Sequence, residues 1–135
     1  MEIQWETVFP FIWKGGSPML TAYKHDENHR LCPVAFEEME KGSWINCAAP
    51  DAAELEKLNA LTGIPVDSLQ TALDREERSH VELEDDFIFV VVNTPVVLET
   101  DAYDALPLGI FITDKVFVTA VSYTHLRAHE TCADL

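Results

Sequence analysis

The chain has 135 residues, of which 24 are Asp or Glu and 9 are Lys or Arg, so its formal net charge is −15 at pH 7. This length is enough for one domain that buries a core without disulfides or bound metal. Because an acidic surface repels nucleic acid phosphates and anionic lipid headgroups and attracts cations, we expect no nucleic acid partner.

The apolar segments are too short to cross a bilayer as helices. A transmembrane helix needs about 20 consecutive apolar residues, and the longest uninterrupted apolar run is residues 87–92. This chain by itself is therefore not expected to form a channel.

The first predicted elements are strands. Residues 20–23 and 31–35 flank a polar segment, a pattern that predicts a hairpin. Residues 43–47 form a third predicted strand, after a turn at Lys41 and Gly42.

Two short helices are predicted next. Asp51 and Glu54 have the spacing of a capping box at the start of the first helix, and Gly63 is placed to end it in the left-handed conformation. Its apolar face is predicted to hold Leu55, Leu58 and Leu61. Pro65 and Asp67 open the second helix, with Leu69 and Leu73 on one side.

Four further strands follow the helices. A strand from Val81 turns at residues 85–86 into residues 87–93, and Pro95 predicts a bend or a sheet edge. We interpret Phe89, Val91 and Val92 as the centre of the sheet. Residues 108–112 and 116–119 form a final predicted hairpin.

The predicted fold class is α/β, of the α+β kind with a mixed sheet whose helices cover at least one face. Its central strands are expected to bury Trp44, Phe89 and Ile110.

A series of motifs in fixed order carries a family resemblance. Residues 72–82 read ALDREERSHVE, residues 84–86 read EDD, and residues 106–114 read LPLGIFITD. Over roughly residues 19–120 the chain resembles the cytoplasmic N-terminal domain of CorA-type magnesium transporters, in their CorA-like bacterial branch.

The resemblance implies a function and a location. It implies a regulatory and assembly-forming domain, on the cytoplasmic side of the inner or cell membrane, in a homopentamer that transports Mg²⁺, Co²⁺ or another divalent cation. In the family the pore and its Gly-Met-Asn motif lie on long downstream helices, and no such motif occurs here. We therefore interpret the chain as a truncated subunit that would meet the membrane only through helices it lacks. The alternative is a freestanding acidic α/β binding or enzyme domain that shares the fold.

Asp74 and Glu77 are the candidate metal-contacting residues. Mg²⁺ prefers oxygen ligands, often takes only one or two carboxylates and keeps several waters. The resemblance implies that an acidic pair on the second short helix contributes to regulatory sites at subunit interfaces, but those positions are Gln70 and Thr71 here. Asp74 lies one turn after Gln70 and could present a carboxylate to a neighbouring subunit. We expect weak, regulatory binding of Mg²⁺ and no tightly bound cofactor.

A second acidic cluster follows this segment, and the acids of the segment itself have a purely structural interpretation. The cluster comprises Glu82, Glu84, Asp85 and Asp86. In the structural alternative, Asp74, Glu76 and Glu77 pair with Arg75 and Arg78 on a solvated surface. The alternative explanation of the acidic surface is that it only keeps the protein soluble.

No catalytic motif is present. The chain has neither a phosphate-binding glycine loop nor a GxSxG elbow. His80 and Glu82 would share one face of a strand, and we expect Cys47 to be a buried, inert thiol. Its three cysteines lack CxxC spacing, which indicates a reducing cytosol. We predict that the chain is not an enzyme.

The C-terminal residues break the pattern of the domain. Residues 121–131 read VSYTHLRAHET, the translation of a transposase sequencing adapter in one frame. We interpret residues 121–135 as an artefact. His125 and His129 have the spacing of a helical metal-binding pair, and Cys132 follows them. We exclude them as a metal site because they belong to the artefact.

The N-terminal residues have no counterpart in the resemblance. Residues 14–16, KGG, can be encoded by a purine-rich ribosome-binding sequence ahead of a start at Met19. We interpret residues 1–18 as an upstream extension and residues 19–120 as the domain, incomplete at its C-terminus. The alternative is a native extension whose aromatic side chains pack on the domain: Trp5, Phe9, Phe11 and Trp13.

Overall fold

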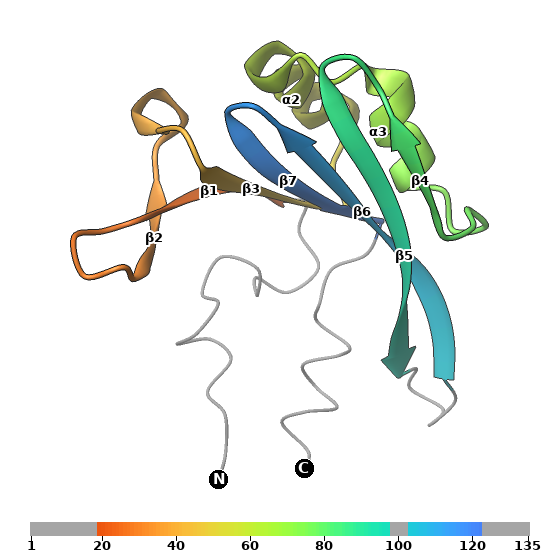
Figure 1. Cartoon of the computed structure of the whole chain (residues 1–135). Helices are drawn as coiled ribbons and strands as arrows, with labels where there is room; N and C mark the ends of the chain where they lie inside the picture. Colours follow the sequence, from red (N-terminus) through yellow and green to blue (C-terminus); the bar gives the residue numbers. More distant parts are fainter. Residues whose placement is uncertain (1–18, 98–102, 123–135) are drawn as a thin grey trace, which may run out of the picture.

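The computed structural model describes residues 19–97 and 103–122, and Figure 1 shows their arrangement. The predictions for residues 1–18 and for His125, His129 and Cys132 lie outside the described residues. The elements, in chain order, are β1 Met19–His25, β2 Leu31–Val34, the 3₁₀ turn η1 Phe36–Glu38, β3 Ser43–Ala48, α2 Ala52–Thr62, α3 Val66–Ala72, β4 His80–Leu83, β5 Phe87–Val97, β6 Tyr103–Thr113 and β7 Val116–Val121.

The strands form one seven-stranded mixed sheet in the order β2-β1-β3-β7-β6-β5-β4. Neighbouring strands are antiparallel except β3 and β7, which run parallel from Ser43 beside Val116 to Ala48 beside Val121. Helices α2 and α3 lie on the same face of the sheet (Figure 1). The predicted α/β class, the first hairpin and the last hairpin are confirmed.

Helix α2 follows its local signals at both ends. The Asp51 carboxylate accepts the Glu54 N–H at 2.8 Å, and the Glu54 carboxylate accepts the Asp51 N–H at 3.1 Å. Gly63 ends the helix with φ 79°, a conformation that costs a residue without Cβ little. In the described part of the chain, no helix has the length and hydropathy needed to span a membrane.

The apolar face of α2 differs from the prediction in one position. Leu55 and Leu58 are buried, but Leu61 is 37% exposed. Residues three apart advance by 300°, so the third leucine rotates away from the sheet. Ile64, just beyond the helix, is fully buried. In α3, Leu69 is buried as predicted, whereas Leu73 forms the C-cap and is half-buried.

Strand β5 is not at the centre of the sheet. It is the second strand from the edge, and only alternate residues face the core. Phe89 and Val91 are buried, but Val92 is 40% exposed on the opposite face. The prediction of a central strand was wrong because an apolar run does not specify which strands pair on either side.

Pro95 lies at a sheet edge, but it does not interrupt the strand. β5 continues to Val97 and pairs with β6 throughout, whereas β4 covers only Ile88 to Val91. On the uncovered edge, the Asn93 N–H donates to the Ser79 hydroxyl at 3.1 Å, and Pro95 has no N–H to offer. Both features oppose pairing of this edge with another strand.

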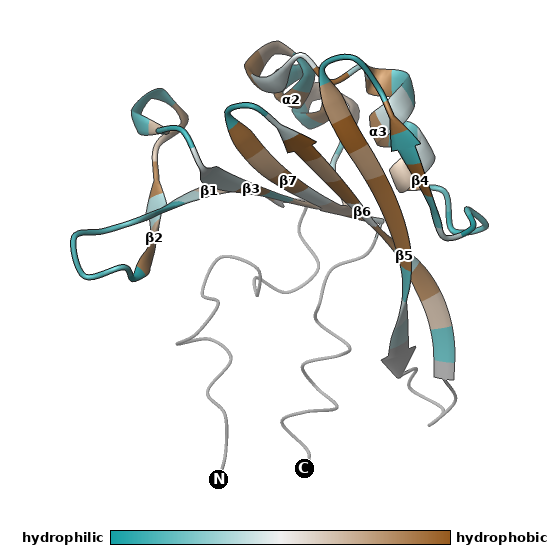
Figure 2. Ribbon diagram, in the orientation of Figure 1, coloured by the Kyte–Doolittle hydropathy of each residue, from teal (hydrophilic) through white to brown (hydrophobic). Residues whose placement is uncertain are grey.

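The core lies between the sheet and the two helices, and Figure 2 shows hydrophobic residues concentrated on β5, β6 and β7. Phe89 and Phe111 are fully buried there and stack with ring centroids 4.4 Å apart. Trp44 and Ile110, predicted with Phe89, are half-buried. Strand alternation places them on the other face of the sheet.

Candidate functional site

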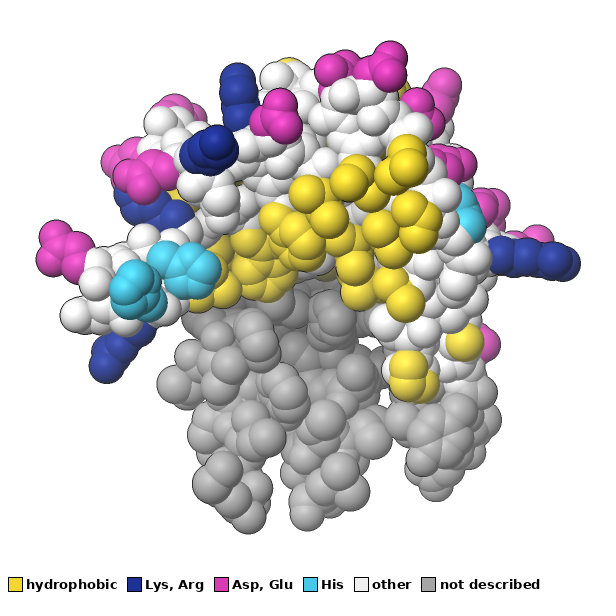
Figure 3. Space-filling view, in the orientation of Figure 1, with side chains coloured by type: hydrophobic (Ala, Val, Ile, Leu, Met, Phe, Trp, Pro, Cys, Tyr) yellow, Lys and Arg dark blue, Asp and Glu magenta, His cyan; other side chains and the backbone are white. Residues whose placement is uncertain are grey.

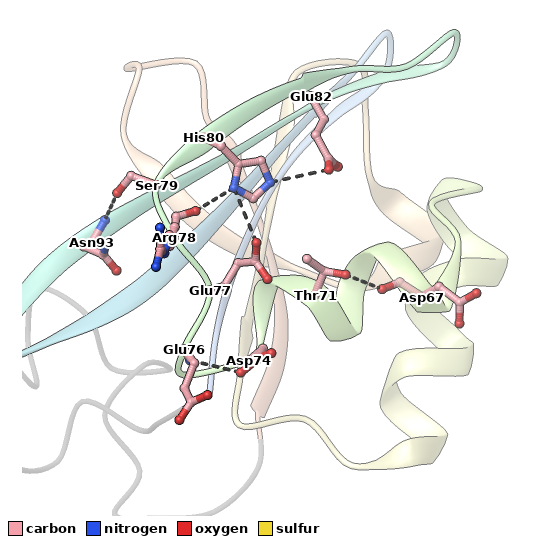
Figure 4. A network of polar contacts seen from close by, with 10 residues as sticks. All are labelled: Asp67, Thr71, Asp74, Glu76, Glu77, Arg78, Ser79, His80, Glu82 and Asn93. Atoms are coloured by element: carbon pink, nitrogen blue, oxygen red, sulfur yellow. Dashed lines mark hydrogen bonds and ion pairs between the residues drawn. The ribbon is translucent and has the colours of Figure 1, made fainter.

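Asp74 lies in the turn that follows α3. It is exposed, and its Oδ1 accepts the Glu76 N–H at 3.0 Å. Its backbone carbonyl accepts the Glu77 N–H at 3.0 Å. These bonds fold the segment back toward β4, so one carboxylate oxygen of Asp74 already serves the turn (Figure 4).

Glu77, the second predicted metal residue, contacts a histidine. Its Oε1 lies 3.5 Å from Nδ1 of His80, and Oε1 of Glu82 lies 3.5 Å from Nε2 of the same ring. The ring is held by the Arg78 carbonyl, 2.6 Å from Nδ1, and meets Phe89 edge-on with centroids 5.7 Å apart. Figure 4 shows the imidazole between the two carboxylates.

This arrangement limits what the segment can do with a metal ion. The two carboxylates flank opposite nitrogens of His80, so the three side chains do not converge on one point. Across residues 19–97 and 103–122, no group of three His, Cys, Asp or Glu side chains could hold a metal ion. Asp74 and Glu77 remain predictions for weak metal contact.

The structural alternative for these acids is wrong in its partners. In the described segments, neither Arg75 nor Arg78 forms an ion pair with Asp74, Glu76 or Glu77. The partner of Glu77 is His80. Glu77 and His80 are only three residues apart, but the sequence did not indicate their contact, because no helix was predicted for this segment.

Gln70 and Thr71 occupy the positions where the resemblance implies acids. Gln70 is exposed on α3, and the Thr71 hydroxyl donates to the Asp67 carbonyl at 3.0 Å. Neither side chain carries charge, so this surface lacks the acidic pair. Asp67 itself is exposed in the first turn of the helix.

Cys47 is a buried thiol. Burial in the core, and secondarily the charge of Glu54, raises the pKa of the Cys47 thiol from 9.0 to about 12. Because the thiolate is the nucleophile, this cysteine is unreactive at neutral pH. The prediction that Cys47 is buried is confirmed, and its raised pKa agrees with the interpretation of an inert thiol.

One hollow was not predicted from the sequence. It has a volume of about 350 Å³ and lies where the end of α2 meets the β4–β5 and β6–β7 turns. Its lining residues are Leu61, Thr62, Gly63, Asp86, Thr113, Asp114, Lys115 and Val116. Only the fold brings the two turns together, so no sequence signal could have found it.

The seven-stranded mixed sheet with both helices on one face is the architecture of a CorA-type soluble domain. The chain belongs to this family: the model of the CorA-like Mg²⁺ transporter proteins matches residues 40–133. The cobalt/magnesium transport protein CorA of Methanocaldococcus jannaschii is 33% identical over 90 residues, which are 67% of this chain and 27% of that protein.

Two solved structures share the fold. The complete CorA magnesium transporter of Methanocaldococcus jannaschii has a TM-score of 0.67 and 27% identity over 85% of this chain and 35% of that chain. The soluble domain of the same CorA has a TM-score of 0.64 and 28% identity over 86% of this chain and 45% of that chain. This chain therefore spans less than half of each relative. These relatives are transporters by name, and they give no support to a freestanding enzyme.

Proposed function

We propose that this chain is the cytoplasmic regulatory and assembly domain of a CorA-like transporter of Mg²⁺ or another divalent cation. In this proposal it is one part of a homopentamer subunit, and the stalk and the membrane pore lie on a segment outside it. The observation that carries the proposal is the match of 86% of the chain to the soluble domain of a CorA protein.

The acidic surface supports a role next to a cation pathway. Residues 19–120 contain 20 Asp and Glu against 7 Lys and Arg, a net charge of −13. Such a surface raises the local concentration of cations. With Gln70 and Thr71 in place of an acidic pair, regulation by bound metal would depend on exposed carboxylates such as Asp74 and Glu77. One or two such ligands, with water in the remaining positions, bind Mg²⁺ weakly.

The test is transport by the longer native gene. The genomic DNA that follows the codon of Ala120 is cloned with residues 19–120 and expressed in bacteria that lack their own magnesium uptake systems. Growth at low Mg²⁺ and cation uptake into the cells are the expected results. A native gene that ends shortly after Ala120, or a longer protein that restores neither growth nor uptake, would contradict the proposal.

A further inference from the structure

His80 and Glu82 form an accessible pair of metal-binding groups on β4. They are alternate residues of the strand, so their side chains lie on the same face of the sheet. Oε1 of Glu82 lies 3.5 Å from Nε2 of His80, and the two side chains are 46% and 29% exposed, so water and ions can reach both. Figure 3 shows Asp, Glu and His side chains together on the β4 side of the molecule.

The contact at the other ring nitrogen of His80 determines which nitrogen carries the hydrogen. Nδ1 lies 2.6 Å from the Arg78 carbonyl oxygen, and a carbonyl oxygen only accepts hydrogen bonds. Nδ1 is therefore the donor, and in the neutral imidazole Nε2 presents a lone pair on the side of the Glu82 carboxylate. Histidines that bind metals are typically arranged in this way, with the second ring N–H donated to a carbonyl or a carboxylate.

The separation of Nε2 and Oε1 fits two ligands of one metal ion better than it fits a hydrogen bond. A charge-assisted N–H···O bond between an imidazolium and a carboxylate is about 2.7–2.9 Å long, shorter than the 3.5 Å found here. In a tetrahedral Zn²⁺ site, bond lengths of about 2.0–2.2 Å place two ligand atoms about 3.3–3.5 Å apart. In an octahedral Mg²⁺ site, bond lengths of about 2.0–2.1 Å place adjacent oxygens only about 2.8–3.0 Å apart.

The imidazole ring is held in place by its surroundings. It meets the fully buried Phe89 edge-on, with centroids 5.7 Å apart, and it is tied to the Arg78 carbonyl. A ligand that is already oriented loses little freedom when it binds. The Glu77 carboxylate lies 3.5 Å from Nδ1, on the other side of the ring from Nε2 (Figure 4). The site at Nε2 therefore has two protein ligands, and water would complete a tetrahedral shell.

We propose that Nε2 of His80 and Oε1 of Glu82 bind a divalent transition-metal ion that accepts tetrahedral nitrogen and oxygen ligands, for which Zn²⁺ is the probe. Imidazole nitrogen suits Zn²⁺ and similar ions, whereas Mg²⁺ is suited by carboxylate, carbonyl and water oxygens. The site thus differs from the weak carboxylate contacts in the proposed function. It does not depend on transport, so failure of either test leaves the other conclusion intact.

Histidine ¹⁵N NMR on the 135-residue chain tests the tautomer and the metal together. The chain carries His125→Gln, His129→Gln and Cys132→Ser, which remove the His-x-x-x-His pair and the thiol near the C-terminus. Without metal, we expect His80 to be in the form with hydrogen on Nδ1. Zn²⁺ should then shift the Nε2 resonance of His80 and leave the hydrogen on Nδ1, and an excess of Mg²⁺ should not reproduce this shift.

Substitution of each ligand locates the ion, with affinities measured by calorimetry in the same chain. His80→Gln and Glu82→Gln should each weaken Zn²⁺ binding about tenfold or more, because loss of even an outer partner of a ligand typically costs about 10–100-fold. Glu76→Gln is the matched control: it removes the same charge from the adjacent turn, where the carboxylate points away from the ring (Figure 4). It should change the affinity less than about twofold, since solvent and salt screen an exposed charge that does not contact the ion. Urea unfolding without metal checks that each variant is folded.

Four results would overturn the site. Hydrogen on Nε2 of His80 at neutral pH without metal, in the neutral ring or in an imidazolium, would leave no lone pair beside Glu82. An unchanged affinity for Zn²⁺ in folded His80→Gln would exclude the ring as a ligand. Equal loss of affinity in Glu76→Gln and Glu82→Gln would mean that Zn²⁺ responds only to the acidic surface. A loss in Glu77→Gln without one in Glu82→Gln would place the ion at Nδ1.

Discussion

Gly109 on β6 permits a contact that a larger residue would prevent. A Cβ atom added at Gly109 would lie 2.4 Å from the Cβ of Ala72 at the end of α3. Since two carbon atoms prefer a separation of roughly 3.5–4.0 Å, Gly109→Ala would force α3 and β6 apart by about 1 Å. Ala72 is fully buried, so no exposed side chain can move aside.

The expected cost follows from two opposing terms. Overpacking a well-packed core costs about 1–3 kcal/mol, whereas replacing Gly by Ala stabilises by about 0.4–1 kcal/mol through the unfolded state. We therefore expect Gly109→Ala to lower the free energy of unfolding by about 1–2 kcal/mol. For a domain of this size, each kcal/mol corresponds to roughly 4–8 °C in Tm.

Urea unfolding followed by tryptophan fluorescence and circular dichroism measures this loss, and Ala72→Gly tests its cause. Alone, Ala72→Gly should destabilise by about 1 kcal/mol through helix propensity, with a further cost for the lost methyl group. Combined with Gly109→Ala, it makes room for the new methyl group, so the two losses should not add. Gly63→Ala is the control: it is strained by its φ of 79° with nothing within 4 Å of the added Cβ, and Ala72→Gly should not rescue it.

The reasoning would be refuted by either of two results. One is a loss below about 0.5 kcal/mol for Gly109→Ala, which is within the range of an ordinary surface substitution. The other is strict additivity of the two substitutions, which would mean that the residues do not interact.

The remaining predictions concern the core, the buried thiol and the metal. Phe89→Ala should cost about 3–5 kcal/mol in urea unfolding; a cost below about 1 kcal/mol would contradict its burial against Phe111. The pKa of the Cys47 thiol is 9.0 ordinarily and about 12 in the fold, so its contribution to stability is complete below pH 9 and is lost as pH rises toward 12. Cys47→Ala should therefore flatten the fall in the free energy of unfolding between pH 9 and 10.5. An unchanged slope would contradict the raised pKa of Cys47. Calorimetry on the 135-residue chain should show Mg²⁺ and Co²⁺ binding no tighter than roughly 10⁻⁴–10⁻³ M, and micromolar binding abolished by Asp74→Ala would reveal a complete site in one chain.

The parts of the fold set by nearby residues could be predicted. The start and end of α2 depend on Asp51, Glu54 and Gly63, whose interactions lie within five residues of each other along the chain. Hairpins join strands that follow one another in the chain, so the β1–β2 and β6–β7 hairpins could also be predicted. Strand order is different, because it depends on contacts between distant segments. The apolar run in β5 therefore suggested a central strand, although β5 is next to the edge.

The candidate site shows the same division. The sequence identified Asp74 and Glu77 as candidate metal-contacting acids, but it did not identify the partner of Glu77. His80 reaches Glu77 because the segment folds back on the Asp74 turn and because β4 places the ring against Phe89. That geometry requires the pairing of β4 with β5, which no residue of the segment specifies by itself.

Two of the stretches that carry the family resemblance meet in space. Ala72 begins the first of them and Gly109 lies in the middle of the other, and their atoms form the tight contact between α3 and β6. Between them, His80 of the first stretch packs its ring on Phe89, which stacks on Phe111 of the second. These residues therefore pack the last turn of α3 and strand β4 against the sheet. By contrast, Gln70 is exposed on α3, and the Thr71 hydroxyl donates to the Asp67 carbonyl of the same helix. Both side chains are uncharged, so membership of the family accounts for the architecture of this domain, while regulation by bound metal is a question for experiment.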